Sequence, residues 1–181
     1  MMKKIALCVL PILCIWTFND GCTLAGHTSL NTDMSREFKN ARKLYNKREI
    51  RENLKAAIGI YRNVLKQIPD NCENCNEKRA EVFIELSRCY FKMAEYHVTD
   101  TNEKSMWFEM GEECGREATI LDPNNAGGYY WMAQNLGEHG NISKFYFLNK
   151  KCDFEEALRK AEMLDNPKKS YDYSGINRTL A

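Results

Sequence analysis

Helix-stop signals recur three times along this chain, and this recurrence constrains the fold more than any other feature. Residues 64–71, 118–125 and 161–167 each run from an apolar-periodic stretch into a cluster of Pro, Asp and Asn. Such a cluster ends a helix where the chain turns back on itself. A spaced recurrence of the signal is typical of an array of helical hairpins, which presents a surface to partners. We therefore expect a binding protein, not an enzyme, and we assign no catalytic residues.

The composition agrees with a folded helical protein. The chain has 181 residues, enough for one domain with a continuous core, and 44% of them are hydrophobic, with only 4 Pro and 10 Gly. No run of alternating Val, Ile and Thr is bounded by hairpin turns. The predicted fold is all-α, with antiparallel helical hairpins of tetratricopeptide-like repeats stacked in a right-handed superhelix. The stops are spaced more widely than the ~34 residues of that repeat, which implies lengthened helices and loops.

Apolar periodicity places the helices of three hairpins. We expect the first pair at about 32–45 and 54–68, and the second at about 77–97 and 101–121, with Asp100 or Thr101 as the cap between them. The third pair is expected at 127–137 and 154–164, across a looser segment at 138–141. Residues 145–148 either continue the earlier helix or start a short one. Residues 171–181 look like the start of a fourth hairpin, so the chain is either truncated or ends with an unusual cap.

The N-terminus is typical of an export signal. Two lysines precede a short apolar stretch, so we expect residues 1–21 to be a signal peptide, 22–31 a flexible tether and 32–181 the repeat domain. Gly21-Cys22 suggests a lipoprotein acylated on Cys22, and cleavage after Ala25 is the alternative. The expected location is the periplasm, free or anchored through a lipid. Membrane contact is expected only through the signal or this anchor.

The charge balance excludes one class of partner. The whole chain has 26 basic and 25 acidic residues, and removal of Lys3, Lys4 and Asp20 with the signal leaves 24 of each. A neutral chain of mixed charges has no electrostatic footprint for nucleic acid. We expect a protein partner, with a homo-oligomer left open.

Cys72 and Cys75 form a C-x-x-C sequence in the turn after the first stop. A redox dithiol is one interpretation, although no βαβ pattern surrounds it. Zinc binding is a second, with Cys89, His97 or Cys114 completing the site. The third, which we favour, is a disulfide in this turn or from it to a helix, or inert thiols. We therefore assign no metal and no cofactor.

An aromatic cluster follows the second stop, and its candidate binding residues are Tyr129, Tyr130, Trp131, Gln134 and Asn135. On the first helix of a repeat, such side chains line the concave face, where Tyr and Trp give a large contact area with a polar tip. The competing interpretation is that the rings pack the hairpin and the core between repeats. Periodicity alone does not separate the two.

Residues 120–125, followed by 129–137, resemble the tetratricopeptide-like T component associated with periplasmic TRAP transporters. Residues 171–178 resemble that family's Tyr-rich, Gly-containing stretch before an Arg. The resemblance implies an exported all-α lipoprotein that binds the solute-binding protein of a TRAP uptake system, with a small apolar ligand. It also implies further helices beyond Ala181. The alternatives are a general envelope scaffold or assembly lipoprotein that binds peptides on its concave face, and a metal or thiol protein that uses the Cys72/Cys75 turn.

Overall fold

The computed structural model describes residues 24–165, and the secondary structure of this part is entirely α-helical. Its six helices are α1 Leu24–Tyr45, α2 Arg51–Gln67, α3 Cys75–His97, α4 Thr101–Leu121, α5 Ala126–Ile142 and α6 Lys144–Leu164. The predicted all-α fold is confirmed. The expected signal at 1–21, the acylation of Cys22 and the fourth hairpin at 171–181 lie outside the described residues and stay predictions.

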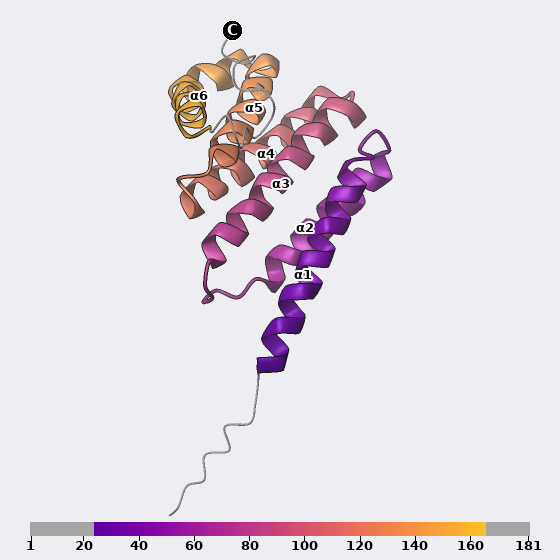
Figure 1. The fold of residues 1–181 in the computed structure, drawn as a ribbon. Coiled ribbons are helices and arrows are strands. Elements are labelled where there is room, and N and C mark those ends of the chain that lie inside the picture. Colours follow the sequence, from indigo (N-terminus) through magenta and orange to yellow (C-terminus); the bar gives the residue numbers. More distant parts are fainter. Residues whose placement is uncertain (1–23, 166–181) are drawn as a thin grey trace, which may run out of the picture.

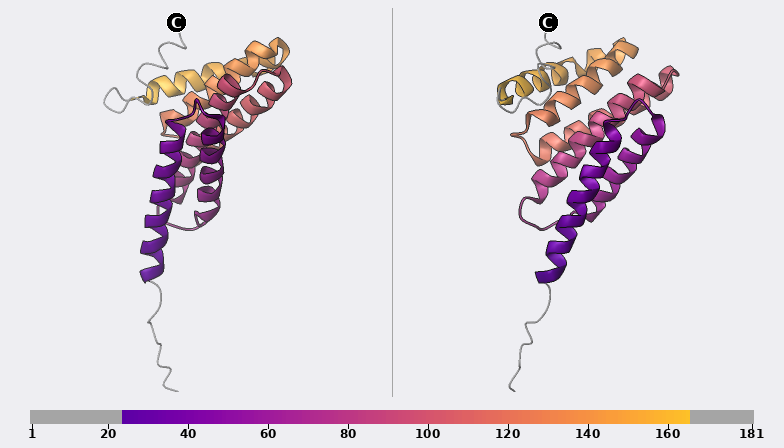
Figure 2. Two further views of the ribbon diagram at one scale, coloured as in Figure 1. Left: turned by 90° about the vertical axis from the view of Figure 1, so that its right-hand side faces the viewer. Right: turned by 45° about the vertical axis from the view of Figure 1, so that its right-hand side comes forward.

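Helices that follow one another in the sequence are neighbours in space and run antiparallel (Figure 1). The described helices therefore form hairpins, as expected, and α3 also contacts α5, the first helix of the next hairpin. Figure 2 shows that the α5–α6 hairpin lies across the direction of α1, so the array rotates along its length. Tetratricopeptide-like stacking in a right-handed superhelix stays a prediction.

The helix ends agree with the stop and cap signals in the sequence. α2 ends at Gln67, shortly before Pro69, and α4 ends at Leu121, before Pro123. The Asp100 carboxylate caps α4 by accepting a hydrogen bond from the Glu103 amide at 2.8 Å. A side-chain oxygen in this position satisfies one of the amides that a helix N-terminus leaves unpaired.

Several helices extend beyond the predicted limits. α1 begins at Leu24, so residues 24–31, expected in a flexible tether, are helical. The second difference is that α5 continues through 138–141, and α6 begins at Lys144 after a break of one residue. Ser143 makes this break, because its hydroxyl oxygen accepts a hydrogen bond from the Tyr146 amide at 3.3 Å. Gly140, in the segment expected to be looser, makes room for Phe147 of α6, since a Cβ there would lie 2.5 Å from that ring.

The hydrophobic core is divided along the array. One cluster of buried side chains joins α1, α2 and α3, and a second joins α3, α4, α5 and α6. A smaller third cluster lies between α5 and α6. Each hairpin therefore buries its apolar face against the next one, as in other helical arrays. Within residues 24–165, none of the helices is both long enough and apolar enough to cross a membrane.

Candidate functional site

The structure places most of the predicted aromatic site inside the protein. Tyr130, Trp131 and Asn135 are 4%, 5% and 0% exposed, and only Tyr129 and Gln134 are partly accessible. The Trp131 ring lies edge-on to Phe91 of α3, with 5.6 Å between the ring centroids. The packing interpretation therefore describes this cluster, and the interpretation as a binding surface is wrong for the three buried residues. Helix α5 is covered by α3, α4 and α6, which leaves little of it for a partner.

Asn135 has a structural role inside this core. Its side-chain amide donates hydrogen bonds to the carbonyl oxygen of Trp131 at 2.8 Å and to the hydroxyl of Ser87 at 3.1 Å. The Ser87 hydroxyl donates in turn to the carbonyl oxygen of Gly111 at 2.7 Å. These bonds link α3, α4 and α5 at one buried point, where polar groups need partners because water is absent.

A surface groove between α1, α2 and α3 is a better candidate for a binding site. We call it the α1–α3 groove, and its volume is about 290 Å³. Its apolar lining residues are Met34, Phe38, Val64, Ile68 and Val82, and its polar lining residues are Ser35, Lys39, Arg42, Lys78 and Glu81. The groove therefore combines an apolar floor with a rim that carries three cations and one carboxylate.

Arg42 of α1 is held on this rim by two carboxylates of α3. Its Nε donates to Glu85 Oε1 at 3.1 Å, and its Nη2 donates to Glu81 Oε1 at 3.3 Å. The guanidinium carbon also lies 5.0 Å from the centre of the Phe38 ring. Burial lowers the pKa of Arg42, but the Glu85 and Glu81 charges outweigh this effect, so that the pKa is raised. The rim cation is thus permanently charged and fixed in position.

Glu85, which anchors this arrangement, is not among the residues predicted from the sequence. Its carboxylate is 1% exposed and pairs with both Arg42 and Arg88, the latter at 3.3 Å. A buried carboxylate without cations is strongly destabilising, so these two arginines are needed for it. The available signal was a single acidic residue within the apolar stretch 82–86.

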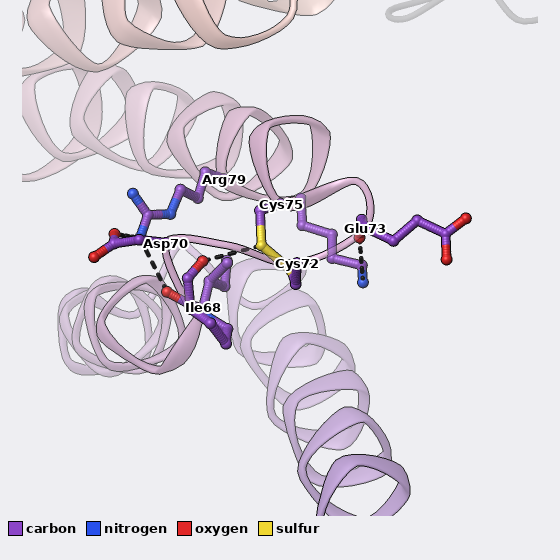
Figure 3. Close-up of a disulfide and its surroundings, with 8 residues drawn as sticks. Ile68, Asp70, Cys72, Glu73, Cys75 and Arg79 are labelled. Carbon is purple, nitrogen blue, oxygen red and sulfur yellow. Dashed lines mark hydrogen bonds and ion pairs between the residues drawn. A yellow bond between two sulfur atoms is a disulfide. The ribbon is translucent and has the colours of Figure 1, made fainter.

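The turn between α2 and α3 lies between Ile68 and Lys78, two residues that line the groove. Cys72 and Cys75 are joined there by a disulfide, with their Cα atoms 5.2 Å apart. Figure 3 shows the guanidinium group of Arg79 reaching from α3 to this turn, where its Nη2 donates to the Ile68 carbonyl at 3.0 Å and to the Asp70 carboxylate at 2.5 Å. The favoured interpretation of this C-x-x-C sequence agrees with the structure.

The zinc interpretation of the turn finds no support in the described residues. No group of three or more potential ligands from His, Cys, Asp and Glu could hold a metal ion within residues 24–165. His97, one of the proposed ligands, instead lies 2.7 Å from the carbonyl oxygen of Arg48. Burial raises the pKa of Cys114 to about 12, so this thiol is protonated and unreactive at neutral pH.

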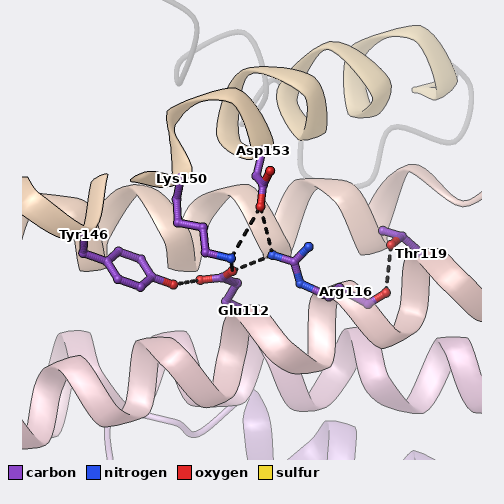
Figure 4. Close-up of polar contacts among 6 residues, drawn as sticks. All are labelled: Glu112, Arg116, Thr119, Tyr146, Lys150 and Asp153. Carbon is purple, nitrogen blue, oxygen red and sulfur yellow. Dashed lines mark hydrogen bonds and ion pairs between the residues drawn. The ribbon is translucent and has the colours of Figure 1, made fainter. Parts of the chain in front are cut away.

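A second polar cluster joins α4 to α6 (Figure 4). The Glu112 carboxylate is 4% exposed, accepts a hydrogen bond from the Tyr146 hydroxyl and pairs with Arg116 at 2.7 Å. Asp153 of α6 lies 3.4 Å from Arg116 and 3.5 Å from Lys150. Acidic and basic side chains alternate in this cluster, so each charged group pairs with one of opposite sign. We therefore interpret it as an inter-helix support.

Comparison with known proteins gives one match. Residues 37–173 match the sequence model of the family described as Regulator of microtubule dynamics protein 1-3. Neither comparison with curated proteins nor comparison with solved structures gives a match.

This match overturns the resemblance to the TRAP transporter T component, and with it the prediction of a TRAP-associated periplasmic lipoprotein. The structure supplies the physical reason for the error. Residues 122–125 end α4 and cap the start of α5, and Tyr130 and Trp131 are core residues. The motif at residues 120–125 and 129–137 therefore reflects how a hairpin packs, and it does not identify a partner.

Proposed function

Because the chain belongs to the Regulator of microtubule dynamics protein 1-3 family, we propose that it is a non-catalytic helical module that acts on microtubules by binding a polypeptide segment in the α1–α3 groove. The observation that carries the proposal is the combination of an apolar floor with a cationic rim. This combination suits a segment with an apolar anchor beside acidic residues.

The size of the groove supports a polypeptide partner. Pockets that enclose small molecules range from about 300 to 1,000 Å³ and bury most of the ligand surface. At about 290 Å³ the groove is at the lower end of this range and is open to solvent. It accommodates one or two side chains of a segment that continues across the surface, as peptide-binding grooves do.

The charges on the rim favour an acidic segment. Arg42 is fixed by Glu85 and Glu81, whereas the Nζ of Lys78 reaches only a backbone carbonyl, that of Glu73, at 3.4 Å. Lys39 is exposed on the same side, and Arg36 and Lys43 extend the basic surface along α1. An acidic partner therefore approaches a predominantly positive edge, which speeds encounter and fixes orientation.

Co-sedimentation with microtubules polymerised from purified tubulin tests this proposal. Full-length protein should pellet with microtubules, and the double variant Lys39→Glu/Lys78→Glu should bind at least about tenfold more weakly, because two rim charges become repulsive. The matched control is Lys55→Glu/Lys144→Glu, which changes the net charge equally at two exposed positions outside the groove.

The control variant should retain the affinity of the wild type, and circular dichroism should show that both variants are folded. Equal weakening by the two double variants would mean that only net charge matters, which contradicts docking in the groove. Absence of wild-type protein from the pellet at low salt would contradict the proposed partner.

A further inference from the structure

The turn between α2 and α3 is flanked by two residues that line the α1–α3 groove. Ile68 follows the last residue of α2 and is 4% exposed, and Lys78 lies in the first turn of α3. Both line the groove. The nine residues between Ile68 and Lys78 therefore connect the α2 side of the groove to its α3 side and influence their spacing.

Polar contacts, without apolar packing, hold this turn in place besides the disulfide. Residues 69–74 are all exposed, so the turn has no apolar contacts that bury it. The pair between Arg79 and Asp70 involves a carboxylate whose side chain is 88% exposed, and such pairs contribute little. The turn's other polar contacts include the hydrogen bond from Arg79 to the Ile68 carbonyl and a backbone bond from Cys75 to Cys72 at 3.3 Å. Lys78 adds a backbone bond to the Asn74 carbonyl at 3.1 Å and a bond from its Nζ to the Glu73 carbonyl at 3.4 Å.

The disulfide is the covalent restraint on this region. Cys75 is the first residue of α3 and is 4% exposed, and its sulfur lies 3.0 Å from the carbonyl oxygen of Pro69. Asn74, inside the disulfide loop, has a left-handed backbone with φ of 58°, a conformation that side chains other than Asn, Asp and Gly rarely adopt. The bond therefore holds a tight turn against Pro69, directly after Ile68.

We propose that the Cys72–Cys75 disulfide is a redox switch for the α1–α3 groove: the groove is formed while the bond is intact and loosens at the Ile68 end when a dithiol reduces it. This inference rests on the proposed binding function of the groove. Reduction frees the turn, and Ile68 and Lys78 then lose their fixed spacing, which weakens the binding of a partner segment.

The chemistry of the switch is thiol–disulfide exchange with a protein or small-molecule dithiol. A thiolate of the dithiol attacks the sulfur of Cys72, which is exposed, whereas Cys75 is buried. The Cys72–Cys75 bond breaks, and Cys75 leaves as a thiolate that takes up a proton. The second thiol of the dithiol then displaces Cys72, so that two electrons pass from the dithiol to the two cysteines. The products are two thiols in the protein and one disulfide in the reductant.

Peptide mapping of the full-length protein establishes the state of the bond. Trypsin releases residues 67–78 as one peptide that contains Cys72 and Cys75 and no other cysteine. After incubation with glutathione disulfide, this peptide should lack the mass of two hydrogen atoms. After treatment with dithiothreitol it should be alkylated twice. Recovery of two free thiols after the oxidising incubation would overturn the proposal.

Amide hydrogen exchange over residues 64–82 then measures the switch. Exchange at the Ile68 end should be about tenfold faster in the reduced protein than in the oxidised protein. The variant Cys72→Ser should exchange at the fast rate under both conditions. Cys152→Ser, which removes an exposed thiol outside the turn, should respond as the wild type does. Equal exchange in the oxidised and reduced wild type would overturn the switch.

Microtubule pelleting in the two redox states separates this inference from the proposed function. Oxidised wild-type protein should bind several-fold more tightly than reduced protein, and Cys72→Ser should match the reduced protein. Failure of the oxidised protein to pellet defeats the proposed function, whatever the exchange data show. An unchanged exchange rate, or equal binding in both states, defeats the switch alone.

Discussion

At the scale of single residues, glycine positions record where helices approach closely. A Cβ built on Gly115 of α4 would lie 2.7 Å from the Cα of Met132 in α5, a distance that real Cβ atoms do not show. The atom it meets belongs to the backbone, so no side-chain rotation can relieve the overlap. Gly59 of α2 is different, because nothing lies within 4 Å of the same position there.

The substitution Gly115→Ala should therefore lower the free energy of unfolding by about 1–3 kcal/mol, as overpacking in a core does. Gly59→Ala, the matched control, should raise it by up to about 1 kcal/mol, because alanine is the better helix former and meets no neighbour. Urea unfolding followed by circular dichroism measures both. Equal effects of the two substitutions would show that α4 and α5 do not pack at Gly115.

At the scale of elements, the α5–α6 hairpin joins to α4 through a set of coupled polar side chains. His139 of α5 stacks on Tyr146 of α6, with 3.9 Å between the ring centroids. The Tyr146 hydroxyl donates a hydrogen bond to the Glu112 carboxylate of α4. Burial lowers the pKa of His139, against the opposing effect of the Glu109 and Glu112 carboxylates. The imidazole is therefore neutral in the folded protein at neutral pH.

This lowered pKa makes stability depend on pH. As the pH falls below 6.5, the ordinary pKa of histidine, the unfolded chain takes up a proton at position 139 before the folded chain does. The unfolded state then binds more protons, so the free energy of unfolding decreases as the pH falls. Above the ordinary pKa, His139 causes no such decrease in the free energy of unfolding.

Urea unfolding should be measured at one pH above 6.5 and at one pH below it. Between these two pH values, the free energy of unfolding should fall less in His139→Gln than in the wild type. His97→Gln keeps His139 and serves as the control, which should retain most of the wild-type loss. An identical loss in the wild type and in His139→Gln would contradict the assignment.

At the scale of the whole molecule, the array is stabilised by contacts between neighbours. α3 contacts α2, α4 and α5 extensively, whereas the main neighbour of α1 is α2 and the main neighbour of α6 is α5. Two core clusters share helix α3, which therefore belongs to both halves of the described part. In such arrays the stability of each element depends on how many neighbours cover it.

Amide hydrogen exchange across the protein should follow this order. Protection should be greatest in the middle of α3 and in α4, and lowest in α1 and α6, because an end helix is covered on one side of the array only. Mass spectrometry of exchanged peptides measures the gradient. Uniform protection across the six described helices would mean that they unfold as one cooperative unit.

Several features of this fold could be predicted from the sequence alone. The stops at Pro69, Pro123 and Asp165, the cap at Asp100 and the all-α class depend on chemistry within one turn of helix, so the residues themselves contain the information. The join between α5 and α6 was missed, because residues 138–141 were expected to form a looser segment, whereas Gly140 lies within α5 and makes room for Phe147. Glycine occurs both in loops and where two helices pack closely, and only the neighbouring helix distinguishes the two cases.

By itself, the sequence determined where helices stop and that they return as hairpins, since capping and proline effects are local. Tertiary structure alone decided which faces are covered. It buried Trp131 and Asn135, which the sequence analysis had assigned to a binding surface. It also paired Glu85 with two arginines, one of which lines the groove. Burial depends on which helices pack against a residue, and those helices lie far away in the chain. For that reason the groove, and the position of the disulfide turn beside it, are properties of the assembled array.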